Sequence, residues 1–220
     1  MSKIKAVIYD VDDLMVDSYA LHVEASEKAL ERYGHRFDEL PEELRSHFVG
    51  RRVIDNLKDT VAYLKLDVDP EVMYQERLAL FHRLVREKLE ARPGLQESMT
   101  LFRRHNLRLA IASSGAGEYL DAVLEKFNLA GYFEVIISGG DVQKGKPDPE
   151  TYLVAVQKLG LTPAECLVLE DAKNGVESAK AAGCKCIAIR NPNTPVQDHS
   201  GADKVLNSLS DVTIEMVESL

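Results

Sequence analysis

The strongest signal in this chain of 220 residues is Ile4-Lys5-Ala6-Val7-Ile8-Tyr9-Asp10-Val11-Asp12. The apolar run that opens it is typical of a buried parallel strand, and two carboxylates follow where that strand should end. In open α/β sheets, ligands bind beyond the carboxyl ends of the strands. Like charges this close together raise the free energy unless a cation or a proton compensates them. The doublet therefore indicates either a catalytic, metal-binding strand end or a pair of solvated acids.

The composition limits the class of protein. The chain is 45% hydrophobic, which is enough for one core with a smaller inserted domain. It carries a net charge of −9 and has no basic stripe, so we expect no nucleic-acid partner. No apolar run could cross a bilayer and no signal-peptide core is present, so we expect no membrane partner. The three cysteines (Cys166, Cys184 and Cys186) lie in apolar segments and favour a reducing, cytoplasmic location.

Two kinds of pattern divide the chain. Residues 17–92 carry apolar positions at helical spacing and contain no strand-like run. Beyond them, strand-like runs alternate with helical segments, at 107–112, 133–138, 166–169 and 184–189. This alternation predicts an α/β fold with a doubly wound parallel sheet. Because the first strand belongs to that sheet, we expect a core domain of residues 1–16 and 93–220, with residues 17–92 inserted as a helical cap domain.

Polar residues follow several of the predicted strands. The carboxyl ends of parallel strands share one edge of the sheet, so we expect a cluster formed by Asp10, Asp12, Ser113, Ser114, Lys144, Lys146, Glu170 and Asp171. Carboxylates attract a hard cation such as Mg²⁺, and a hydroxyl with a lysine can hold a phosphate. Together these groups suit phosphoryl transfer, in which one carboxylate acts as nucleophile and another as general acid and base.

The same residues resemble the motifs of the haloacid dehalogenase superfamily, and most closely its beta-phosphoglucomutase-like branch of phosphatases and mutases. The matching segments are Asp10-Val11-Asp12 with Leu14 and Asp17-Ser18, then Ser113, then Lys146-Pro147-Asp148-Pro149, then Glu170-Asp171. The resemblance spans the whole chain, including the cap inserted after the first motif. It implies a Rossmann-like core of the kind found in that superfamily.

The resemblance also implies roles. Asp10 would be the nucleophile that forms a phosphoaspartate, and Asp12 would protonate the leaving oxygen and then activate the acceptor. Ser113 would donate to the phosphoryl oxygens and Lys146 would neutralise charge. The residues beside Ser113 on the same loop are further candidates for substrate binding, namely Ser114 and Gly115.

The metal site and one departure from the family pattern involve neighbouring residues. Mg²⁺ would be held by the Asp10 carboxylate, the Asp12 backbone carbonyl and Asp171, with Glu170 beside it. The family usually has glycine after the second aspartate, whereas this chain has Asp13. Aspartate tolerates a left-handed backbone better than most residues. Asp13 is therefore either an accommodated loop residue or an added negative charge that weakens phosphate binding or alters metal affinity.

Two cap residues are candidates for substrate binding. His22 matches the hinge histidine of the mutase-like branch, although a lone histidine on a helix is often only solvated. Arg51, with Arg52, follows Gly50 near the position where the branch has a substrate-specificity loop, although charged pairs usually form a solvated face. Lys144 resembles a second phosphate-facing lysine and is more often simply exposed.

The expected function is a Mg²⁺-dependent phosphatase acting on a small phosphorylated metabolite such as a sugar phosphate. One alternative is a beta-phosphoglucomutase-type isomerase, which His22 favours. However, Val53 and Leu78 stand near the places where mutases have the cap cations that grip a second phosphate. A non-catalytic ligand-binding relative is disfavoured because the chemical positions are filled, and dehalogenation is disfavoured by Asp12. The sequence leaves the substrate's identity and the oligomeric state open.

Overall fold

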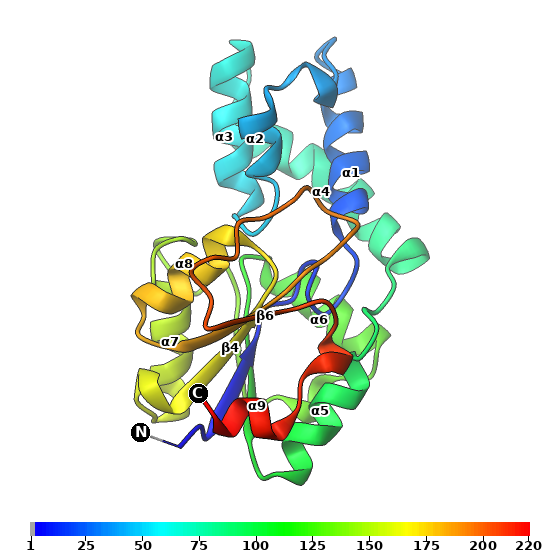
Figure 1. The fold of residues 1–220 in the computed structure, drawn as a ribbon. Helices are drawn as coiled ribbons and strands as arrows, with labels where there is room; N and C mark the ends of the chain where they lie inside the picture. The colour runs from blue at the N-terminus through cyan, green and yellow to red at the C-terminus, as the bar shows by residue number, and fades with distance from the viewer. Residues whose placement is uncertain (1–2) are drawn as a thin grey trace.

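The core of the structure is one parallel β-sheet whose six strands are ordered β3-β2-β1-β4-β5-β6. The computed structural model describes residues 3–220, and Figure 1 shows the sheet below a group of helices. The strands are β1 (Ala6–Tyr9), β2 (Arg108–Ala112), β3 (Val135–Ile137), β4 (Cys166–Glu170), β5 (Lys185–Ile189) and β6 (Lys204–Leu206). All neighbouring strands pair in parallel. The predicted α/β fold with a doubly wound parallel sheet is therefore confirmed.

Helices cover both faces of this sheet. They are α5 (Leu95–Arg104), α6 (Gly117–Lys126), α7 (Glu150–Leu159), α8 (Lys173–Ala181) and α9 (Ile214–Glu218). Tyr9 of β1 faces the apolar layer that contains Phe102 of α5, whereas Ile8 faces the layer that contains Tyr152 of α7. Successive side chains of a strand point to opposite faces, so a strand covered on both sides must be apolar throughout. This is why the run before Asp10 carries so clear a signal.

The remaining helices all lie between β1 and α5. They are α1 (Tyr19–Glu31), α2 (Glu42–Ser46), α3 (Val53–Leu64) and α4 (Pro70–Lys88), and they form the upper part of Figure 1. These helices share an apolar cluster distinct from the two layers of the sheet, with Leu30, Phe37, Leu57 and Met73 among its members. A separate cluster supports our proposed division into a core domain (1–16 and 93–220) and a cap domain (17–92). Short 3₁₀ helices complete the elements, at Phe37–Glu39, Ala130–Tyr132, Pro163–Glu165 and Leu209–Asp211.

Two linkers join the helical part to the sheet, and they bind each other. The backbone N–H of Asp17 donates to the Glu90 carbonyl (3.0 Å), and the N–H of Arg92 donates to the Met15 carbonyl (2.8 Å). The Asp17 carboxylate also accepts from the Arg92 guanidinium (3.2 Å) and from the Asn191 side-chain amide (3.1 Å). Asp17 thus has a structural use, because its side chain holds both linkers to the loop after β5.

The state of the cysteines and the polarity of the helices can be read from the structure. Cys166, Cys184 and Cys186 are free and buried. Within residues 3–220, every helix is too short or too polar to span a membrane.

Candidate active site

The register of the sheet brings the predicted strand ends together. Tyr9, the last residue of β1, lies opposite Ile111 of β2 and Leu169 of β4. The residues that follow these three positions therefore emerge at the same edge, as the parallel topology predicts. They include Asp10, Ser113, Glu170 and Asp171.

Lys146 lies at the centre of this edge. Its Nζ atom is 2.6 Å from an oxygen of Asp10 and 2.7 Å from an oxygen of Glu170, and it also donates to the Ala112 carbonyl at 3.2 Å. The side chain is fully buried. Burial alone would lower the pKa of Lys146, but the two carboxylates outweigh it and raise that pKa. The lysine is therefore a fixed positive charge beside Asp10.

Glu170 is held from several directions. Its Oε1 atom accepts from Lys146 and from the Tyr152 hydroxyl (2.6 Å), and its Oε2 atom accepts from the backbone N–H groups of Asp171 (2.9 Å) and Ala172 (3.0 Å). The carboxylate sits where a side chain at Gly175 would stand, because a Cβ there would lie 1.7 Å from Oε1. Glycine at the first turn of α8 is thus a requirement of the site.

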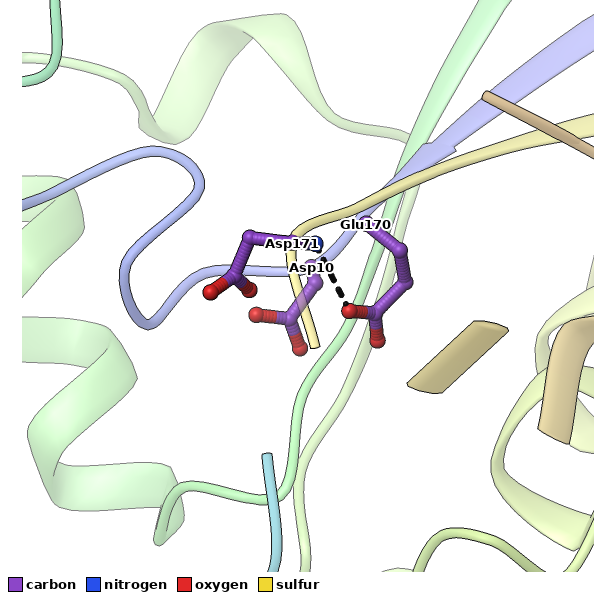
Figure 2. Close-up of side chains that lie close together, drawn as sticks. All are labelled: Asp10, Glu170 and Asp171. Carbon is purple, nitrogen blue, oxygen red and sulfur yellow. Dashed lines mark hydrogen bonds between the residues drawn. The ribbon is translucent and has the colours of Figure 1, made fainter. Parts of the chain in front are cut away.

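Three buried carboxylates converge at the same place. Single oxygens of Asp10, Glu170 and Asp171 all lie within 4.8 Å of one another, and Figure 2 shows the three side chains turned toward a common point. The Oδ2 atom of Asp171 is buried without a hydrogen-bond partner. Burial, with the neighbouring acids, raises the pKa of Asp10 and of Asp171 well above the ordinary range. Three acids against one lysine leave an excess of negative charge, and an oxygen-rich site of this kind fits a divalent cation such as Mg²⁺.

Asp12 points to a different set of partners. Its Oδ1 atom accepts from the Ser18 hydroxyl (2.7 Å), the Tyr119 hydroxyl (2.7 Å) and Nε2 of His22 (3.3 Å). Burial would raise the pKa of Asp12, but these hydrogen bonds and the histidine lower it. The residue is therefore a carboxylate whose three hydrogen bonds all go to Oδ1, which leaves Oδ2 outside this set of partners.

A buried arginine fixes the protonation of His22. Nη2 of Arg77 lies 2.7 Å from Nδ1 of His22, and its Nε donates to the Ser26 hydroxyl at 3.0 Å. Arginine can only donate, so Nδ1 accepts and the ring proton lies on Nε2, the nitrogen that faces Asp12. Burial and the charge of Arg77 also lower the pKa of His22. The histidine is thus a neutral donor to Asp12.

Asp13 turns out to be a helix cap. Its backbone φ is 62°, in the left-handed region. Its Oδ1 atom accepts from the backbone N–H groups of Ser18 (3.0 Å) and Tyr19 (2.8 Å), at the start of α1. Ser18 is the N-cap residue, but its hydroxyl is bound to Asp12 and does not cap the helix. Asp13 supplies the missing acceptor, which supports the interpretation of an accommodated loop residue.

The loop after β2 forms part of the same edge. Ser113 is fully buried, and its hydroxyl accepts from the N–H of Gly115 at 2.9 Å. The hydroxyl of Ser114 donates to the carbonyl of Gly50, in the cap, at 3.0 Å. Lys144 is mostly exposed and pairs with Asp148 at 3.6 Å. The structure therefore brings Ser113 to the edge, whereas Lys144 stays at the surface.

A cavity of about 260 Å³ lies between the cap and the core, and Asp12 is reached from it only through two lining residues that contact it, His22 and Tyr119. Its lining includes both His22 and Tyr119, and also Ser114 and Gly115. Arg51 does not reach it, since its guanidinium binds His47 (2.8 Å) and Asp59 (3.1 Å). Arg52, the next residue in the chain, lines the cavity instead.

Sequence reasoning missed two residues that contact Asp12 or His22, namely Tyr119 and Arg77. Arg77 has the appearance of one more charged residue on an amphipathic helix, and only the fold reveals that it is 2% exposed. Tyr119 lies one turn into α6 with no motif around it. Neither carried a signal that spacing could have detected.

Comparison with known proteins agrees with this geometry. The sequence profile described as haloacid dehalogenase-like hydrolase matches residues 7–189. The chain is 31% identical to a phosphorylated carbohydrates phosphatase of Thermotoga maritima, over 83% of each chain. It is 32% identical to hexitol phosphatase A of Escherichia coli (strain K12), over 96% of this chain and 94% of that one.

The solved structure of a beta-phosphoglucomutase from Clostridium difficile has the same fold. Its TM-score is 0.85, over 98% of this chain and 96% of that one, at 19% identity. The profile match, the two relatives and the shared fold all agree with the resemblance carried by the short motifs at the strand ends. The chain therefore belongs to the haloacid dehalogenase-like hydrolase family.

Proposed function

We propose that the protein is a Mg²⁺-dependent phosphatase that hydrolyses a small phosphorylated metabolite, such as a sugar phosphate, through a phosphoaspartate on Asp10. The observation that carries the proposal is the contact of Lys146 with Asp10, in the same cluster as Asp171, whose Oδ2 atom has no hydrogen-bond partner. A buried nucleophile with a fixed cation and a vacant acceptor atom suits the transfer of a dianionic group. The free cysteines support a cytoplasmic location.

In the first step, an oxygen of Asp10 attacks the phosphorus atom and the bond to the leaving alcohol breaks. Lys146 holds the nucleophile in place and offsets the charge on the phosphoryl oxygens, with help from the Ser113 hydroxyl. The charge of the bound phosphoryl group raises the proton affinity of Asp12. Oδ2 of Asp12 then gives its proton to the leaving oxygen.

In the second step, Oδ2 of Asp12 takes a proton from water, and the water oxygen attacks the phosphorus of the phosphoaspartate. The bond between phosphorus and Asp10 breaks, which regenerates the carboxylate and releases inorganic phosphate. His22, Ser18 and Tyr119 keep Oδ1 occupied through both steps, so the proton is exchanged at one oxygen only.

Asp10, Asp171 and the Asp12 backbone carbonyl would hold Mg²⁺, with Glu170 beside them. When bound, it would supply Lewis-acid stabilisation of the negative charge on the transferring group. Glu170 is already occupied by Lys146, Tyr152 and two backbone N–H groups. Its main task is therefore to position Lys146 and the loop that carries Asp171.

A beta-phosphoglucomutase-type isomerase is the second candidate, because His22 contacts Asp12 as that chemistry would require. It receives less support from the cap, where Val53 and Leu78 line the cavity with apolar side chains. Interconversion of glucose 1-phosphate and glucose 6-phosphate, primed with the bisphosphate, would favour the mutase.

The direct test of the phosphatase is phosphate release from sugar phosphates, nucleotides and p-nitrophenyl phosphate, with Mg²⁺ and with EDTA. We expect release that depends on Mg²⁺ and disappears in Asp10→Asn. If Asp10→Asn still releases phosphate, Asp10 is not the nucleophile.

A further inference from the structure

We propose that the cavity between the cap and the core selects phosphate monoesters whose alcohol carries no second anionic group, and that Asp55 and Glu71 impose this preference. The inference rests on the proposed phosphatase function and narrows its substrate to a class. The leaving alcohol would occupy this cavity, whose lining includes His22 and Tyr119, both in contact with Asp12.

The cavity has few charges in its lining. Among the described residues that line it, the side chains charged at neutral pH are Arg52, Glu71 and Arg77. The cap contributes apolar and aromatic surface, from Val53, Ile54, Tyr74, Leu78 and Phe81. Such a lining suits the carbon face of a sugar or another ring, and the volume of about 260 Å³ suits a small metabolite.

Arg77 is already committed to the acid/base group. Its guanidinium donates to the Ser26 hydroxyl and to both Nδ1 and the backbone carbonyl of His22. The side chain is 2% exposed, and it lies over the ring of Phe81 with its guanidinium carbon 5.0 Å from the ring centroid. Binding of a second phosphate by Arg77 would take these donors from His22. That would disturb the residue that orients Asp12.

Arg52 already has an acidic partner in the protein without substrate. Its Nε atom donates to Asp55 at 2.7 Å, and Nη1 donates to the carbonyl of Gln143 at 3.2 Å. The side chain also lies against the core, where a Cβ on Gly145 would stand 2.9 Å from Nε. Arg52 therefore bridges the cap and the core and is paired with Asp55, which also lies 3.8 Å from Nζ of the exposed Lys58.

Glu71 adds a negative charge to the same cavity. It lies in the first turn of α4 and is exposed, with Gln75 as its hydrogen-bond partner at 3.0 Å. An anionic group on the leaving alcohol would approach this carboxylate without a free cation to balance it. Like charges brought together in this way are strongly unfavourable. Bisphosphates and phosphorylated acids should therefore be poor substrates.

The test compares substrates that differ mainly in charge. Suitable pairs are glucose 6-phosphate with 6-phosphogluconate, glycerol 3-phosphate with 3-phosphoglycerate, and glucose 1-phosphate with glucose 1,6-bisphosphate. We expect kcat/KM to favour the member with the neutral alcohol by about tenfold or more in each pair the enzyme accepts. The preference should weaken as salt increases, because it is electrostatic.

Variants of the two acids assign the preference to residues. Asp55→Asn frees the charge of Arg52, and Glu71→Gln removes the repelling carboxylate. Each should raise kcat/KM for the charged member and narrow the ratio by about threefold or more. Asp59→Asn is the matched control, because Asp59 lies on the same helix and pairs with Arg51 outside the cavity. It should leave the ratio unchanged.

Each result has one meaning. Phosphate release with equal or better use of the charged members would overturn the inference and leave the phosphatase in place. Unchanged ratios in folded Asp55→Asn and Glu71→Gln proteins would overturn the assignment to these residues. Absence of release from every member of the panel in Mg²⁺ would contradict the phosphatase itself.

Discussion

Replacement of Asp13 by the glycine that is usual in the family should destabilise this protein. The Asp13 carboxylate accepts from the backbone N–H groups of Ser18, the N-cap residue, and of Tyr19, the first residue of α1, while the Ser18 hydroxyl is bound to Asp12. In Asp13→Gly, the Ser18 N–H loses its partner in a buried position. The start of the first cap helix would then be left without a cap.

The expected change in the free energy of unfolding combines two costs and one gain. Loss of a helix cap costs about 0.5–2 kcal/mol, and a buried donor without a partner costs about 1–3 kcal/mol. The φ of 62° at Asp13 is a strained backbone that glycine relieves, by about 1 kcal/mol. The two costs less the gain give an expected loss of about 0.5–4 kcal/mol in the free energy of unfolding. For a chain of this length that lowers Tm by several degrees.

The assay is thermal and urea unfolding in EDTA, with Asp13→Asn as the matched variant. Asparagine keeps an acceptor oxygen and tolerates the left-handed region, so we expect Asp13→Asn to lose much less stability than Asp13→Gly. The reasoning would be refuted if Asp13→Gly were as stable as the parent protein. It would also be refuted if the two variants lost stability equally, since the acceptor would then have no effect.

Three further outcomes follow from the same contacts. Burial raises the pKa of Asp13 from 3.8 to about 7, so between these pH values the folded protein keeps a proton that the unfolded chain has released. In EDTA the free energy of unfolding should therefore fall as the pH rises from about 4 to about 7. Asp13→Asn should lack that part of the pH dependence. Arg77→Met should lower kcat and change its pH profile, because His22 would no longer be held as an Nε2–H donor; Arg77→Lys should restore part of the profile if the effect comes through the histidine. Tyr119→Phe should raise the pKa of Asp12 and lower kcat by roughly ten- to a hundredfold, since a hydrogen bond to a charged group contributes about 1.5–3 kcal/mol.

The strand ends were the part of this protein that the sequence could predict. Asp10 directly follows the apolar run of β1 and Glu170 ends that of β4, and parallel topology alone brings such positions to one edge. Lys146 lies in the loop between β3 and α7, and its place came from the resemblance to the family motif. The doubly wound sheet followed from the alternation of strands and helices and is confirmed by the structure. The local sequence pattern is enough to predict the position of a residue that directly follows or ends a strand.

The roles of the cap residues were less predictable, because they depend on where each side chain points in the folded protein. Arg51 and Arg52 are adjacent, yet one turns toward Asp59 within the cap and the other lines the cavity. Arg77 is buried only because α4 packs across α1. The capping role of Asp13 depends on Ser18 being bound to Asp12, a contact between residues whose spacing gives no indication of it. Tertiary packing decided each of these.

The most direct test of the account is to trap the phosphoaspartate in Asp12→Asn with p-nitrophenyl phosphate and Mg²⁺. The nitrophenolate leaving group needs little protonation, so the first step should proceed, whereas loss of the base should stall the second. We predict a burst of about one nitrophenolate per protein, with phosphate found on Asp10 by peptide mass spectrometry after an acid quench. Steady release without a burst, or phosphate on another residue, would contradict the central claim that Asp10 is the nucleophile and Asp12 the acid and base.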